Sequence, residues 1–293
     1  MSAGSGRRAR LYDRVAEETA SVVIRRYSSS FGLASRLLEP RVRQHVENIY
    51  ALVRIADEIV DGEATAAGLT VEEAGRALDN LERETEIAMD RGYSSNLIVH
   101  AFGMTARETG FNRSLTEPFF DSMRTDLTTT EHSRESLDRY VYGSAEVVGL
   151  MCLRAFLQGT DHTDAELAEL ETGARALGSA FQKANFLRDL ASDFRDLGRS
   201  YLPGIRLDSL SETDKNRQVD DIDADLRVAA HAIPRLPAGS RRAVSLAWLL
   251  FADLAAKLRA TPVERLVRTR VRVPGPTKAR IAAAAALGRT PRV

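Results

Sequence analysis

The sequence lacks three features that would point to common function classes. It contains a single cysteine, Cys152, so no internal disulfide can form and a cytosolic location is the default expectation. Its 41 basic residues balance its 41 acidic residues, so no overall positive field would draw it to nucleic acid. No apolar run of about 18 residues occurs, so we expect no membrane-spanning helix. A chain of 293 residues can still bury one large core.

The chain also offers no histidine metal site. Its five histidines show no ligand spacing, and no Glu-x-x-His occurs, which argues against a di-iron helical bundle. Cys152 has no histidine close to it in the sequence, so we expect a buried structural thiol rather than a nucleophile.

Helical periodicity dominates the chain, and the alternation typical of strands is almost absent. We therefore predict an all-α, single-domain helical bundle with a central cavity over residues 11–288, preceded by a disordered tail over residues 1–10. The tail is basic but has no apolar segment behind it, so it does not resemble a signal peptide. Residues 208–223 are polar and predicted to form a loop or short turn. The predicted helices cover residues 12–26, 40–61, 70–90, 95–109, 117–129, 137–158, 163–197, 223–233, 240–260 and 278–287.

Two polar stripes stand out against this helical background. The later one consists of Gln182, Asn185, Asp189 and Asp193, with Arg188 beside it. Steps of three, four and four place these side chains on one helix face, and apolar neighbours predict that the face lies against the core. Buried carboxylates repel one another unless a cation or a proton compensates. Oxygen ligands from Asp and Asn suit a hard cation such as Mg²⁺.

The earlier stripe consists of Tyr50, Arg54, Asp57 and Asp61, at steps of four, three and four. Either stripe alone would be read as a solvated face with surface salt bridges. Two Asp pairs at i, i+4 spacing, each with an Arg within a turn, instead indicate two helices that face each other across a cavity. Divalent ions and guanidinium groups there would hold a diphosphate.

Three further segments accompany the stripes: Tyr-Ser-Ser-Ser-Phe at residues 27–31, Tyr-Val-Tyr-Gly-Ser-Ala-Glu-Val-Val-Gly at 140–149 and Gly-Arg-Ser-Tyr-Leu-Pro at 198–203. In this order, from about residue 27 to 270, the five motifs resemble those of the squalene/phytoene synthase family, and bacterial phytoene synthases in particular. The resemblance implies a class I terpenoid synthase-like fold.

The resemblance also implies roles for individual residues. The ligands of Mg²⁺, with Mn²⁺ as an alternative, would be Asp57, Asp61, Asn185, Asp189 and Asp193. The substrate would be bound by Ser28, Ser30, Tyr50, Arg54, Gln182, Arg188 and Arg270, although a plain helix-ending turn is an alternative for the two serines. Tyr140 would face the cavity, where its ring favours a carbocation and its hydroxyl steers a proton. The catalytic candidates are Asp57, Asp61, Asp189, Asp193 and Tyr140.

Three positions depart from the family pattern. Glu58 replaces an Asp and lies off the stripe, so we expect a supporting role. Lys183 stands where a small or apolar residue is expected, and either faces outward or adds charge near the phosphates. Phe251 stands where many relatives have a tyrosine, which leaves no hydroxyl there.

The implied activity is head-to-head condensation of two geranylgeranyl diphosphates, through a cyclopropyl diphosphate, to phytoene in carotenoid biosynthesis. Small residues expected to line the cavity favour the longer substrate, although they would also let helices approach closely: Ser35, Ser144, Ala145 and Gly149. The alternatives are a squalene, dehydrosqualene or presqualene diphosphate synthase that uses farnesyl diphosphate, or a non-catalytic lipid-binding or assembly relative.

We expect no NADPH requirement, although the missing Gly-rich dinucleotide fingerprint decides little. A cytoplasmic location is expected, with basic residues near the C-terminus either contacting the inner face of the membrane or forming a solvated surface. These residues are Arg265, Arg268, Arg270, Arg272, Lys278 and Arg280.

Overall fold

The computed structural model describes residues 3–61, 63–196, 199–205 and 209–291, and it is built from helices. The α-helices are α1 (Ala3–Tyr27), α2 (Phe31–Ser35), α3 (Pro40–Val60), α4 (Glu63–Ala66), α5 (Val71–Arg91), α6 (Leu97–Thr109), α7 (Arg113–Thr128), α8 (Arg134–Val141), α9 (Val147–Phe156), α10 (Asp164–Asp196), α11 (Glu212–Ala232), α12 (Ala238–Ala260), α13 (Val263–Leu266) and α14 (Gly275–Ala286). The described residues form no strand beyond one isolated bridge between Glu131 and Ser200. The predicted all-α class is confirmed.

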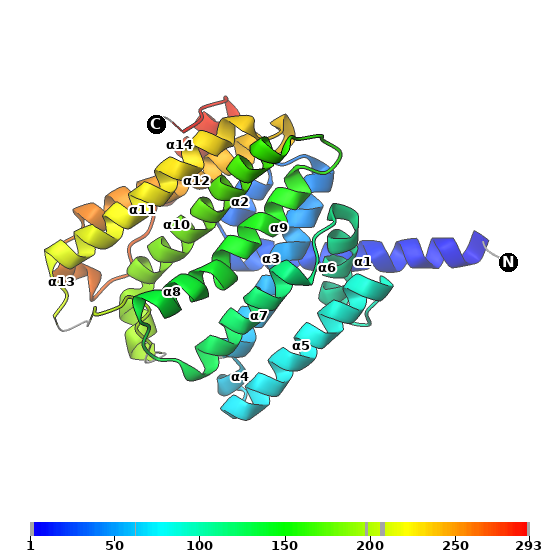
Figure 1. Cartoon of the computed structure of the whole chain (residues 1–293), viewed down its shortest axis with the longest axis horizontal. Helices are drawn as coiled ribbons and strands as arrows, with labels where there is room; N and C mark the ends of the chain where they lie inside the picture. Colours follow the sequence, from blue (N-terminus) through cyan, green and yellow to red (C-terminus); the bar gives the residue numbers. More distant parts are fainter. Residues whose placement is uncertain (1–2, 62, 197–198, 206–208, 292–293) are drawn as a thin grey trace.

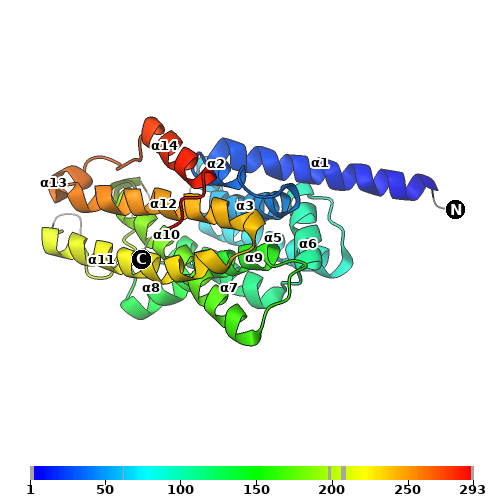
Figure 2. The ribbon, with the colours of Figure 1, turned by 90° about the horizontal axis from the view of Figure 1, so that it is seen from above.

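The helices stack into one bundle in which the axes of α5, α7, α10, α11 and α12 are roughly parallel in Figure 1, while the chain direction alternates between neighbours such as α11 and α12. One apolar cluster joins α1, α3, α5, α6, α7 and α9, and a second joins α8, α10, α11 and α12. Figure 2 shows the N-terminal part of α1 extending beyond this body. Among the helices that the structure describes, none combines the length and the apolar character needed to cross a bilayer.

Local sequence signals explain most helix ends. Thr70 and Glu73 form a capping box at the start of α5, where each side chain accepts a hydrogen bond from the other residue's backbone N–H. Thr163 and Glu166 make the same pair of bonds at the start of α10. Gly110 ends α6 with φ of 78°, a left-handed conformation that glycine adopts without strain.

The structure corrects the prediction for the polar segment that follows the second Asp motif. Residues 212–223 belong to α11 rather than to a loop. Ser211 caps this helix, and apolar side chains spaced for one helix face, Val219, Ile222 and Leu226, are buried. Lys215 is also buried, because its ammonium donates to the carbonyls of Arg259 and Thr261 at the end of α12. The many charged residues of this segment made the apolar face difficult to recognise from the sequence.

Three helix boundaries also differ from expectation. The helix α1 begins at Ala3, inside the segment expected to be a tail. The predicted helix over residues 137–158 is divided by a π-helical turn, Tyr142–Glu146. The helix α14 begins at Gly275 rather than at residue 278, with Pro276 in its first turn. Gly62 and Leu197, at the predicted ends of the helices over residues 40–61 and 163–197, lie outside the described residues.

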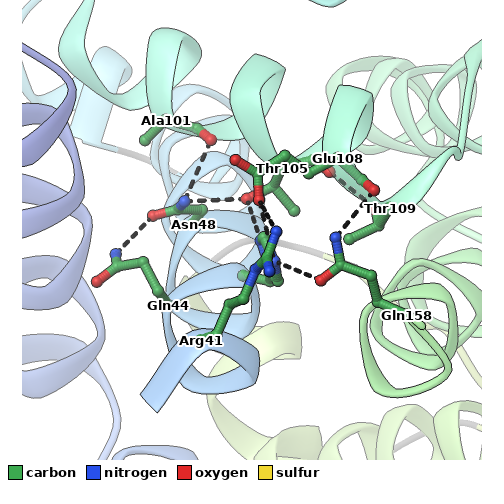
Figure 3. Close-up of polar contacts among 9 residues, drawn as sticks. Arg41, Gln44, Asn48, Ala101, Thr105, Glu108, Thr109 and Gln158 are labelled. Atoms are coloured by element: carbon green, nitrogen blue, oxygen red, sulfur yellow. Dashed lines mark hydrogen bonds and ion pairs between the residues drawn. The ribbon is translucent and has the colours of Figure 1, made fainter. Parts of the chain in front are cut away.

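A buried polar network fixes the position of α3 against its neighbours (Figure 3). The Asn48 side chain donates to the Ala101 carbonyl and to the Thr105 hydroxyl, both on α6. His45 also contacts Thr105, at 3.1 Å, and approaches Gln158 beyond α9 at 3.3 Å. Because unsatisfied buried polar groups are costly, this network specifies the register of α3, which carries the first Asp stripe.

Candidate active site

A cavity of about 860 Å³, lined by residues of both apolar clusters such as Ile49 and Leu254, brings together most of the predicted site residues. Its exposed lining residues, Tyr27, Ser29, Asp61, Arg270 and Arg272, mark the end at which it opens. The interior is apolar and includes Leu153, Phe156, Leu170, Ile233, Leu236 and Val244. The cavity therefore joins a charged entrance to a hydrocarbon-like interior.

The first Asp stripe forms one wall of the charged end. Asp57 and Asp61 both line the cavity. Arg54 and Tyr50, on the two preceding turns of α3, line it beside them. Burial, followed by repulsion from Asp61, raises the pKa of Asp57 well above its usual range, and Arg54 only partly opposes this. A bound cation would stabilise the ionised form of this carboxylate, which Arg54 compensates only in part.

The Arg54 guanidinium is held in place within this wall. It forms an ion pair with Glu58, the position that departs from the family pattern, and lies 4.6 Å from the centre of the Tyr27 ring. Ser28 and Ser30 line the same end of the cavity. The Ser28 hydroxyl also accepts a hydrogen bond from the Phe31 backbone, so it shapes the turn as well.

The second stripe, on α10, forms the opposite wall only in part. Gln182, Asn185 and Arg188 line the cavity. Asp189 does not line it, because its carboxylate is held by Arg188 at 2.5 Å and by Arg270 at 2.6 Å. The side chain of Asp193 lies outside the described residues.

Lys183, the second residue that departs from the family pattern, does not line the cavity. Lys183 donates to Asp225 on α11 at 2.6 Å, and Asp225 also accepts a hydrogen bond from Ser179. Of the two readings of Lys183, the one in which it faces away from the phosphate end is therefore correct.

Aromatic side chains line the cavity beside the charged end. Phe181 and Phe251 stack with their ring centres 3.9 Å apart, and the Phe31 ring lies 5.5 Å from that of Phe181. Phe251, the third residue that departs from the family pattern, therefore packs in an aromatic cluster. All four predicted small residues also line the cavity: Ser35, Ser144, Ala145 and Gly149.

A buried network around Asp126 was missed at the sequence level. Asp126, on α7, accepts hydrogen bonds from the hydroxyls of Tyr140 (2.7 Å) and Tyr201 (2.8 Å). Arg199 approaches the same carboxylate at 3.7 Å, donates to Tyr201 and binds Asp61 at 2.8 Å. The network therefore connects the predicted catalytic tyrosine to the first Asp stripe.

Both tyrosines line the cavity, and each donates its hydroxyl proton to Asp126. The phenol oxygen of Tyr201 also accepts a hydrogen bond from Arg199, so both tyrosines are held as oriented dipoles beside the cavity. Burial raises the pKa of both hydroxyls, which therefore stay protonated. Arg199 and Tyr201 stand in a motif that the sequence displays, but nothing local in the sequence distinguishes Asp126.

The oxygen atoms present at the charged end fit a hard cation. The Asn185 amide oxygen is buried and has no hydrogen-bond partner, although such atoms are normally satisfied. Carboxylate and amide oxygens are the ligands that Mg²⁺ takes. In the described part of the chain, no three His, Cys, Asp or Glu side chains are grouped closely enough to hold a metal by themselves. Burial raises the pKa of the Cys152 thiol, also in the cavity wall, to about 12, as expected for a structural thiol.

Comparison with solved structures gives the same fold. A dehydrosqualene synthase crystallised with a ligand matches with a TM-score of 0.75 at 20% identity, over 93% of this chain and 96% of that one. Squalene synthase HpnC from Alicyclobacillus acidocaldarius matches with a TM-score of 0.71 at 21% identity, over 85% of this chain and 95% of that one. At these identities the likeness concerns the fold alone.

Sequence comparison reaches further. The 15-cis-phytoene synthase of Paracoccus sp. (strain N81106 / MBIC 01143) is 29% identical over 65% of this chain and 60% of its own length. Phytoene synthase 3, chloroplastic, of Zea mays is 34% identical over 66% of this chain and 44% of its own length. The chain thus spans about half of the curated relatives that it matches. Because the squalene/phytoene synthase family model matches residues 24–277, covering both Asp stripes and nearly the whole cavity, the chain belongs to that family.

Proposed function

We propose that this protein is a prenyltransferase that condenses two geranylgeranyl diphosphate molecules head to head into phytoene. The observation that carries the proposal is the single cavity in which a carboxylate and guanidinium end continues into an apolar interior. Such a site suits a substrate with an anionic head and a hydrocarbon tail. Because the relatives are named phytoene synthases, they support phytoene, the forty-carbon product, over a thirty-carbon product.

The residues of the charged end would bind and orient the diphosphate groups. Arg54 and Arg188 line the cavity and offer guanidinium forks to phosphate oxygens, with Gln182 and the two serines beside them. Asp57, Asp61 and Asn185 would hold Mg²⁺, joined by Asp189 once Arg270 turns to the phosphate, and by Asp193. When bound, the cation supplies positive charge that stabilises the departing diphosphate.

The interior would protect the cation formed when the first diphosphate leaves. The double bond of the second substrate attacks carbon 1 of this allylic cation, and loss of a proton closes a cyclopropane ring. Departure of the second diphosphate, rearrangement and loss of a second proton then give the hydrocarbon. The oriented oxygens of Tyr140 and Tyr201 stabilise positive charge, and the apolar walls exclude the water that would quench it.

Phytoene formation releases two diphosphates and two protons and needs no reductant. Squalene formation by the same route would need a hydride from NADPH. We therefore propose Mg²⁺, with Mn²⁺ as a substitute, and no NADPH. We also propose a cytoplasmic enzyme that takes its substrates from the inner surface of the membrane, because both substrate and product partition into lipid.

The test is incubation of the purified protein with geranylgeranyl or farnesyl diphosphate and Mg²⁺, with and without NADPH, followed by hydrocarbon analysis. We expect phytoene from the twenty-carbon substrate, no dependence on NADPH and no product after chelation of the metal. A thirty-carbon product formed faster than phytoene would assign the protein to the squalene or dehydrosqualene branch. Absence of any condensation product would refute the proposed activity.

A further inference from the structure

The outer side of α1 carries apolar side chains that the described residues leave about half exposed. Leu11, Val15 and Val22 are 53%, 40% and 47% exposed, whereas Ala16 and Ala20 on the opposite side are fully buried. At about 100° per residue the three apolar side chains lie within roughly 40° of one another around the helix. They form a stripe along the outside of α1, whose upper side is free in Figure 2.

Basic residues flank this stripe on both sides. Arg14 and Arg25 lie on one side of it and Arg26 on the other, and all three are exposed. The exposed Glu18 lies at the edge of the stripe, about 20° from Leu11 on the side of Arg14 and Arg25, so it lowers the positive charge of that border. An apolar strip between cationic borders is the pattern of a helix that lies in the interface of an anionic bilayer. We name the six residues Leu11, Arg14, Val15, Val22, Arg25 and Arg26 the α1 outer face.

The α1 outer face leads directly to the cavity entrance. The helix ends at Tyr27, which is 55% exposed and lines the cavity, and aromatic side chains of this amphipathic kind favour the membrane interface. The Lys278 ammonium on α14 binds the Ser29 hydroxyl just beyond it at 2.7 Å. The helices α1, α2 and α14 therefore border the same opening, and they share one edge of the molecule in Figure 2.

The chain beyond α12 adds a second basic border to this opening. Residues 263–291 contain seven Lys and Arg residues but one acidic residue, Glu264. Within this stretch Leu287, at the end of α14, is 90% exposed. The charge on both sides of the entrance thus complements an anionic surface, and apolar side chains accompany it on each side.

We infer that the α1 outer face docks on an anionic lipid bilayer and presents the cavity entrance to the membrane surface. The inference rests on the proposed function, since a lipid substrate gives the entrance a reason to meet the bilayer. A bilayer suits this surface better than a protein partner, because the apolar side chains form a convex strip with cationic borders on either side.

The test compares two triple variants that remove equal numbers of exposed apolar side chains. Leu11→Gln, Val15→Gln and Val22→Gln together change the α1 outer face. The matched control is Val71→Gln, Ile87→Gln and Val228→Gln, at positions that are 54%, 43% and 42% exposed on α5 and α11. Co-sedimentation uses vesicles of phosphatidylcholine with and without phosphatidylglycerol, and circular dichroism verifies that each variant is folded.

We expect the unsubstituted protein and the control to bind phosphatidylglycerol vesicles, with weaker binding at high salt. The α1 variant should lose about tenfold or more of the partition coefficient. Arg25→Gln with Arg26→Gln should weaken binding mainly at low salt. Equal binding of the α1 variant and the control, or no binding of the unsubstituted protein to anionic vesicles, would overturn the inference. Self-association that the α1 variant abolishes, without vesicle binding, would assign this face to a second copy of the chain instead.

Activity measurements separate this inference from the proposed function. The α1 variant should be slower on substrate embedded in vesicles but unchanged on substrate dispersed in detergent, because the cavity itself is untouched. A protein that binds vesicles but makes no product in detergent would refute the proposed activity and leave the docking surface standing. A variant equally active in both formats would argue that docking does not deliver the substrate.

Discussion

Replacing Asp126 with asparagine would remove the charge at the centre of the tyrosine network while keeping the shape of the side chain. The carboxylate accepts one hydrogen bond from each of Tyr140 and Tyr201 and faces Arg199. Asparagine keeps one acceptor oxygen but places an amide donor where the second acceptor was. One tyrosine must therefore reorient, and Arg199 keeps Asp61 as its carboxylate partner.

The first measurable consequence concerns stability and pH. Burial raises the pKa of Asp126 to about 6 from a reference of 3.8, against the opposing effect of Arg199 and the tyrosines. The folded protein thus holds this proton more tightly than the unfolded chain does. The contribution to stability is fully present below the unfolded pKa and is lost as the pH rises through about 6. Between about pH 5 and about pH 7.5 the loss is roughly 1–2 kcal/mol.

The second consequence concerns turnover. A hydrogen bond to a charged acceptor contributes about 1.5–3 kcal/mol, and the variant replaces such a bond with a neutral one. If the orientation of Tyr140 and Tyr201 matters in the transition state, kcat should fall by about tenfold to a hundredfold. KM should change little, because neither tyrosine belongs to the proposed diphosphate clamp.

The assay is urea unfolding of the natural protein and of Asp126→Asn near pH 5 and pH 7.5, together with steady-state kinetics. Asp90→Asn, which changes an exposed carboxylate on α5, serves as the control. The stability difference between the two pH values should shrink in Asp126→Asn and persist in Asp90→Asn. An unchanged difference in Asp126→Asn would refute the assigned proton linkage, and an unchanged kcat would refute the positioning role.

Three other substitutions test separate parts of the site. Asp57→Asn should lower turnover by about a hundredfold or more, since lost electrostatic stabilisation costs roughly 3 kcal/mol of barrier, and a folded variant with normal rates would end the proposed metal role. Ser35→Phe should fill part of the cavity and raise the rate ratio of farnesyl to geranylgeranyl diphosphate in competition assays; a constant ratio would remove Ser35 from the tail-binding wall. Gly143→Ala should destabilise the fold by about 1–3 kcal/mol or more in urea unfolding, because its methyl group would overlap the Pro118 carbonyl oxygen and the Ser122 hydroxyl, and unchanged stability would contradict this close packing.

Helix geometry allowed the sequence to predict which side chains share a face. Steps of three and four residues placed Asp57 and Asp61 on one helix face and Gln182 and Asn185 on another, and the structure brings all four to one cavity. The same local periodicity predicted most of the helices. It failed for α11, where the apolar positions 219, 222 and 226 follow helical spacing but charged residues dominate the composition.

Only the tertiary structure decided which partner each carboxylate has and whether it is buried. Asp126 receives Tyr201 from 75 residues further along the chain, and Asp61 receives Arg199 from 138 residues away. Asp189 shares the predicted stripe, yet its carboxylate is paired with Arg270, 81 residues further along the chain, and does not line the cavity. Periodicity is a property of neighbouring residues, whereas burial and charge pairing depend on segments that only folding brings together. The sequence by itself therefore determined the helices and the candidate residues, and the packing of the bundle determined which of them face the cavity and which are already paired.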